Sequence, residues 1–216
     1  MAASILTRWK SLLFSGKAAD PIKLHEADYT VLDTETTGFA VGKDHILSIG
    51  LVRMSQGRIL LKDSLEIIIN GAENLGSSPA IHGITQEQLE NGVNEKTAID
   101  LFEQAVKGTT LVAHYARFDR EMLAALFAKN NRTLPANAWL DTMDVQVALE
   151  PQREGRAELL KLDELLHHYK IDALRRHTAL GDAYSTARVL QHQLAELKNA
   201  NILWSSQLAK KRIGLL

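Results

Sequence analysis

The chain is arranged around one stretch, Tyr29-Thr30-Val31-Leu32-Asp33-Thr34-Glu35-Thr36-Thr37-Gly38. Its first half is β-branched and aliphatic, which predicts a buried strand. Alternate residues of a strand point to the same face, so we expect Asp33 and Glu35 side by side at the strand end. Two carboxylates this close repel each other, and a hard divalent cation relieves the conflict. Taken alone, the stretch also fits a strand that ends in a solvated polar turn.

The composition describes a chain with a substantial core and no dominant charge. Its 216 residues, 45% of them hydrophobic, suit one domain with appendages, and the formal net charge is -1. A polyanion would therefore have to bind through metal ions and a few local cations, because the chain has no excess positive charge. The absence of cysteine excludes disulfides and thiolate metal sites. We recognise no membrane-spanning run and no secretory signal, and we expect a cytoplasmic protein.

Strands come first along the chain, and helices alternate with strands afterwards. Apolar runs at 46–54 and 58–69 flank a Gln56-Gly57 turn and predict an antiparallel hairpin. Shorter strands are expected at 109–113 and 139–142, and longer helices at 95–107, 119–129, 160–169 and 182–198. This order predicts an α/β fold in which a mixed sheet, with an antiparallel hairpin at one side, is flanked by helices.

The two ends of the chain differ from its middle. Residues 1–27 are expected to be an amphipathic helix and a linker, with Ile5, Leu6 and Trp9 on the apolar side of the helix. That helix would either pack on the domain's own surface or dock on a partner or a membrane surface. Residues 28–199 are expected to form the main domain, and residues 200–216 a C-terminal tail.

Further acids and one histidine stand where predicted strands end and predicted helices begin. They are Asp119, His177 and Asp182. Sites in α/β sheets gather at such junctions. Together with Asp33 and Glu35 they form the set that two-metal phosphodiester hydrolysis needs, in which acids hold two ions and a base takes a proton from water. Taken singly, the two added acids also fit the first turns of helices, and His177 fits a surface loop.

Together these residues form three motifs that resemble the DEDDh family of 3'-5' exonucleases, which includes the proofreading epsilon subunit of bacterial DNA polymerase. The motifs are Asp33-Thr34-Glu35-Thr36-Thr37-Gly38, Ala113-His114-Tyr115-Ala116-Arg117-Phe118-Asp119 and His177-Thr178-Ala179-Leu180-Gly181-Asp182-Ala183. The resemblance covers residues 29–197 and implies a ribonuclease H-like fold, with an exonuclease domain at 28–199. Tyr115 departs from the pattern, because many relatives have asparagine after the histidine of the second motif.

The resemblance also implies what each residue does. Asp33 would bridge two divalent ions, Mg2+ or Mn2+. Glu35 and Asp182 would hold the ion that activates water, Asp119 would support the second ion, and His177 would be the general base. The candidates for contacting the 3'-terminal nucleotide are Thr36, Thr37, His82 and Phe118, and a packing role is equally open for His82 and Phe118.

The expected function is the release of nucleoside 5'-monophosphates from single-stranded or frayed 3' ends of DNA, in proofreading or repair. The alternatives are an exoribonuclease of the same family and a non-catalytic module that binds 3' ends. A phosphatase of the haloacid dehalogenase type is disfavoured, because it needs a second aspartate where this chain has Glu35. We recognise no polymerase region, so proofreading would require a DNA polymerase or repair partner, docked through one end of the chain.

Overall fold

A computed structural model describes residues 21–70 and 83–208. The predicted N-terminal helix, the first part of the linker that follows it, the end of the C-terminal tail and the candidate residue His82 lie outside these ranges. The division of the chain at 27/28 and 199/200 stays a prediction. Among the described helices, none has the length and apolar character that crossing a membrane requires.

The five strands of the sheet lie in the order β3-β2-β1-β4-β5. β1 (Asp28–Thr36) pairs antiparallel with β2 (Ile46–Ser55), which pairs antiparallel with β3 (Arg58–Ile68). On the other side of β1, β4 (Thr110–Ala113) pairs parallel with β1, and β5 (Trp139–Asp141) pairs parallel with β4. The predicted mixed sheet with a hairpin at one side is thus confirmed. β1 lies at its centre, so the residues that follow it lie where both halves of the sheet meet.

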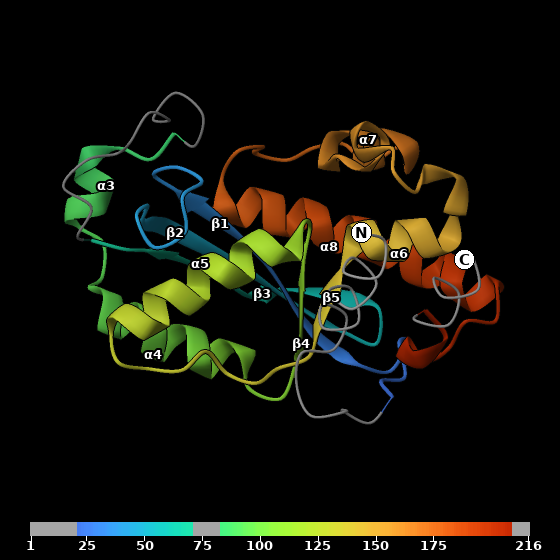
Figure 1. Cartoon of the computed structure of the whole chain (residues 1–216), viewed down its shortest axis with the longest axis horizontal. Helices are drawn as coiled ribbons and strands as arrows, with labels where there is room; N and C mark the ends of the chain where they lie inside the picture. Colours follow the sequence, from blue (N-terminus) through green and yellow to red (C-terminus); the bar gives the residue numbers. More distant parts are fainter. Residues whose placement is uncertain (1–20, 71–82, 209–216) are drawn as a thin grey trace, which may run out of the picture.

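Helices cover both faces of the sheet (Figure 1). α4 (Glu95–Val106) and α5 (Ala116–Lys129) pack on one face, where Leu32, Phe102 and Phe127 share a core. α8 (Ala179–Asn199) and α6 (Thr142–Leu149) pack on the other face, and their core includes Val31. Neighbouring residues of β1 therefore face different helices. The structure also contains α3 (Gln86–Glu90), α7 (Leu162–His168) and the 3-10 turns Pro151–Arg153 and Ala157–Leu160.

Helix boundaries differ from the predicted ones. α5 begins at Ala116, so Asp119 lies inside its first turn and is not its first residue. The physical reason is Asp141, whose carboxylate accepts the backbone N–H groups of Tyr115 at 3.2 Å and of Ala116 at 2.9 Å. This cap comes from the end of β5, and local sequence around α5 contains no sign of it.

The segments just before β1 and just after α8 lie side by side. The Leu24 N–H donates to the Leu203 carbonyl at 2.9 Å, and the Ile22 N–H donates to Ser205 Oγ at 2.9 Å. Leu24 is buried in the core on the α8 side of the sheet. The described part of the predicted linker therefore packs onto the sheet and helices.

Candidate active site

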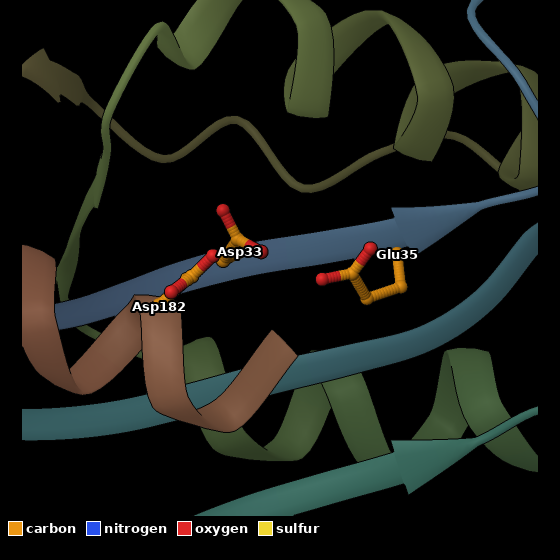
Figure 2. A group of neighbouring side chains, drawn as sticks. All are labelled: Asp33, Glu35 and Asp182. Atoms are coloured by element: carbon orange, nitrogen blue, oxygen red, sulfur yellow. The ribbon is translucent and has the colours of Figure 1, made fainter. Parts of the chain in front are cut away.

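Three carboxylates converge at the end of β1. Asp33 and Glu35 extend from the strand and Asp182 from the first turn of α8 (Figure 2). One ligand oxygen of each lies within 4.8 Å of the others. The strand alternation that was predicted from the sequence thus holds, and it directs both strand acids toward the helix that carries the third acid.

The close approach of α8 to β1 depends on Gly50. This residue pairs with Asp33 in the antiparallel register of β1 and β2. A Cβ atom at position 50 would lie 2.2 Å from the backbone of Ala179 and 2.3 Å from the Leu180 nitrogen. Only glycine leaves room for the start of α8 to rest on the sheet, and that contact brings Asp182 to Asp33.

Asp119 lies beside this cluster and is held separately. Its Oδ1 accepts the Thr34 backbone N–H at 3.0 Å and the Thr34 hydroxyl at 2.8 Å. Thr34 points to the α5 face of β1, opposite its neighbours Asp33 and Glu35. β1 therefore carries two of the predicted acids on the side that faces Asp182 of α8, and it holds Asp119 on its other side through Thr34.

The electrostatics of the site favour proton uptake by the acids unless a cation is present. Burial raises the pKa of Asp33 well above its ordinary value, and the charges of Asp119, Asp182 and Glu35 raise it further. Burial, followed by the charge of Asp182, raises the pKa of Glu35 to about 7. Burial likewise raises the pKa of Asp119 to about 7, against the hydrogen bonds from Thr34. Repulsion of this kind is relieved by a divalent cation.

The donor set fits a hard divalent ion. All the cluster's ligand atoms are carboxylate oxygens, which Mg2+ and Mn2+ accept and which softer metals do not prefer. The oxygens are close enough to share an ion, and the neighbouring Asp119 adds a fourth acid. The residues present are therefore compatible with the metal requirement that the sequence predicts.

His177 lies in a tight turn folded against the start of α8. Its backbone is left-handed, with φ at 61°, and its N–H donates to Asp182 Oδ2 at 3.2 Å. Thr178 Oγ1 donates to the Arg175 carbonyl at 2.8 Å and accepts the Gly181 N–H at 3.2 Å. A Cβ atom at Gly181 would lie 2.1 Å from that carbonyl, so glycine is required there. The exposed His177 is thus fixed at one edge of the acid cluster.

The loop after β1 is organised by Thr37 and Asp44. The Thr37 hydroxyl donates to Asp44 Oδ1 at 2.9 Å and accepts the His45 N–H at 3.0 Å. The Thr36 hydroxyl donates to the Gly38 carbonyl at 2.8 Å. Both predicted threonines therefore hold the loop in shape. The loop presents Phe39, which is 87% exposed.

Phe39 and Phe118 form an aromatic pair between this loop and the first turn of α5. Their ring centroids are 5.8 Å apart, and the rings are tilted by 52°. Phe118 packs partly against the core on the α5 face, whereas the Phe39 ring remains in solvent. Phe118 was predicted from its motif, but Phe39 was not, because an aromatic residue in a loop carries no signal until its exposure is known.

The acids at the carboxyl end of the central strand, with a histidine turn beside them, form the arrangement that the resemblance to DEDDh-type exonucleases predicts. Residues 30–190 match the family described as exonuclease, and the chain belongs to that family. A DNA polymerase III subunit epsilon-like protein of Rhodobacter capsulatus is 35% identical over 182 residues. That match covers 81% of this chain and 25% of the relative, so the chain spans a quarter of that protein's length.

Solved structures confirm the ribonuclease H-like fold. Exonuclease I of E. coli in complex with a dT13 oligonucleotide superposes with a TM-score of 0.67 at 19% identity, over 81% of this chain and 42% of that one. The nuclease domain of 3'hExo, a DEDDh family member bound to rAMP, gives a TM-score of 0.66 at 19% identity, over 80% of this chain and 94% of that one. The predicted family and enzyme class are confirmed by the family match over residues 30–190, and these structures add the fold.

Proposed function

We propose that this chain hydrolyses DNA from its 3' end with two divalent metal ions and releases nucleoside 5'-monophosphates. The observation that carries the proposal is the convergence of Asp33, Glu35 and Asp182 oxygens within 4.8 Å, with Asp119 held beside them. Asp33 would contact both ions, Glu35 and Asp182 one of them, and Asp119 the other. Bound there, Mg2+ or Mn2+ would supply Lewis-acid stabilisation of the attacking and leaving oxygens.

His177 is the proposed general base. Its turn is fixed to Asp182 through the backbone hydrogen bond at 3.2 Å, while the residue itself is exposed. An imidazole in that place can take a proton from the attacking water and pass it to solvent. The proposed base thus lies five residues before Asp182, and the backbone hydrogen bond links its turn to that acid of the cluster.

Phe39 and Phe118 are the proposed stacking surface for the bases at the 3' end. An exposed aromatic ring next to a phosphodiesterase site offers each base a π-face without selecting its identity. Thr36 and Thr37 would serve by holding the loop that carries Phe39. Contacts of His82 with the terminal nucleotide remain part of the proposal, on the resemblance alone.

DNA is the proposed substrate because the relative from Rhodobacter capsulatus is named for a DNA polymerase subunit and the E. coli neighbour was crystallised with a DNA oligonucleotide. The neighbour bound to rAMP favours RNA as the second candidate. A DNA polymerase or repair partner, and with it a cytoplasmic setting, follows from the same relative and is equally a proposal.

The test is degradation of 5'-labelled single-stranded DNA and an RNA of matched sequence, with Mg2+, Mn2+ or EDTA. A ladder that shortens from the 3' end only when metal is present supports the mechanism, and the ratio of the two rates identifies the substrate. Phe39→Ala should raise KM about 5- to 160-fold, since stacking contributes roughly 1–3 kcal/mol per base. Intact DNA and RNA with every metal and folded protein would contradict the proposal.

A further inference from the structure

Arg176 joins the acid cluster to the start of α7. Its Nε donates to Asp163 Oδ1 at 2.7 Å, and its Nη1 forms an ion pair with Asp182 Oδ1. The Arg176 side chain is 19% exposed and that of Asp182 is 11% exposed, whereas that of Asp163 is 68% exposed. A largely buried guanidinium thus bridges a surface acid and an acid of the candidate metal site.

Both oxygens of Asp182 are held by one short segment. Arg176 contacts Oδ1, and the backbone N–H of His177, the next residue, donates to Oδ2 at 3.2 Å. The guanidinium is planar, so its Nε and Nη1 donors keep a fixed angle to each other. Asp163 fixes the outer donor, and the plane of the Asp182 carboxylate is thereby fixed relative to the turn that carries His177.

Arg176 also acts on the cluster through its charge. Its guanidinium places a positive charge next to Asp182 and so offsets part of the negative charge of the cluster. Lysine at position 176 would keep the charge but lose the two-pronged contact, so charge and geometry can be separated by substitution.

We propose that Arg176 is a positioning residue, which holds Asp182 in the orientation for binding a divalent ion and keeps the His177 turn fixed to the same carboxylate. This inference rests on the proposed function, in which Asp182 binds metal. Groups that orient metal-binding carboxylates typically change metal affinity by about 10- to 100-fold. The opposing hypothesis is that the guanidinium and the ion compete for Asp182, and it predicts a change of the opposite sign.

The test is calorimetric titration of the 216-residue chain with Mn2+, without nucleic acid. Arg176→Gln is expected to weaken Mn2+ binding about 10-fold or more, and Arg176→Lys to restore part of the loss. Arg175→Gln, at the exposed arginine next to it, is the matched control and should bind Mn2+ as the wild type does. Thermal unfolding in EDTA establishes that each variant is folded.

Each result decides between the hypotheses. Equal or tighter Mn2+ binding by folded Arg176→Gln overturns the inference, and tighter binding identifies competition. If that variant does not fold, Asp163→Asn decides at an exposed position, where a loss of a few-fold is expected and an unchanged affinity overturns the inference. A wild-type chain that binds no Mn2+ would instead overturn the proposed function, so the two failures are distinguishable.

Discussion

Two sets of half-buried carboxylates near the same end of the sheet have different partners. Asp141, at the end of β5, accepts three backbone N–H groups, from Tyr115 at 3.2 Å and from Ala116 and Met143 at 2.9 Å. Asp33 and Glu35, at the end of β1, face other carboxylates, and burial followed by these charges raises the pKa of both. Asp141 receives its hydrogen bonds from the protein backbone, whereas under the proposed function the second set would be stabilised by a bound cation. Burial alone therefore does not distinguish a structural acid from a functional one, but the partners do.

Asp33→Asn tests most directly whether Asp33 differs in role from Asp141, and we expect the largest effect from this variant. Removing one ligand of the cluster should lower nuclease activity at least about 1000-fold, which corresponds to roughly 4 kcal/mol of activation free energy. In EDTA the same variant should melt a few degrees higher, because one buried repulsive charge is gone. Activity assays and thermal unfolding measure the two effects.

The matched control is Asp63→Asn, which removes an exposed acid of β3 and should change neither quantity. A variant at position 33 that keeps its activity, or that melts lower in EDTA, would show that Asp33 is a structural acid like Asp141.

His177→Gln separates the base from the metal ligands. We expect kcat to fall about 100-fold or more, since general base catalysis is typically worth that much. Mn2+ affinity should stay within about 2-fold of the wild type, because the backbone N–H that holds Asp182 is retained. Steady-state kinetics and calorimetry provide the two numbers. His167→Gln on the exposed side of α7 is the control, and an unchanged kcat at position 177 would exclude the histidine from proton transfer.

The sequence predicted which acids lie together at the end of β1. Asp33 and Glu35 follow from strand alternation, and Asp182 and His177 from their motif, so short-range periodicity and spacing carry the cluster. The mixed sheet follows from the order of strands and helices. Each of these signals lies within a few residues of the feature that it predicts.

The features that the sequence did not predict depend on contacts between segments that are distant in the chain. Asp141 caps a helix that starts 25 residues earlier, and Gly50 makes room for a helix that begins at Ala179. Arg176 was visible only as a basic residue beside His177, because its two acid partners become neighbours only after α7 and α8 have packed. No local propensity contains these pairings, since tertiary packing alone creates them.

Asp141→Ala tests whether Asp141 stabilises the fold by accepting backbone hydrogen bonds. It would leave three backbone N–H groups without their acceptor, and the free energy of unfolding should fall by about 3 kcal/mol. For a chain of this size that lowers Tm by roughly 6–12 °C. Metal affinity of the folded variant should change little compared with Asp33→Asn. Glu121→Ala, at an exposed acid of α5, is the control and should leave the free energy of unfolding nearly unchanged. If both variants lose the same free energy of unfolding, Asp141 does not cap α5.

The smallest effect concerns pH. The pKa of Glu35, which faces Asp182, Glu66 and Arg176, is raised from 4.5 to about 7. A carboxyl group whose pKa is higher in the folded state stabilises that state when protonated, so its contribution is lost as pH rises through about 7. Burial lowers the pKa of His114 to about 4, which acts in the opposite direction but only below its ordinary value of 6.5. The carboxylates therefore dominate between pH 6.5 and 8.

Over this range Tm in EDTA should fall by a few degrees, and saturating Mg2+ should make the fall smaller, because the ion binds the deprotonated acids of the cluster. Asp141 also has its pKa raised to about 7, yet it lies outside the cluster, so its contribution is the same with and without Mg2+. The difference between the two melting curves thus isolates the cluster. Glu35→Gln should flatten the curve in EDTA, and a Tm that is equally dependent on pH in both conditions would mean that these acids titrate without regard to metal.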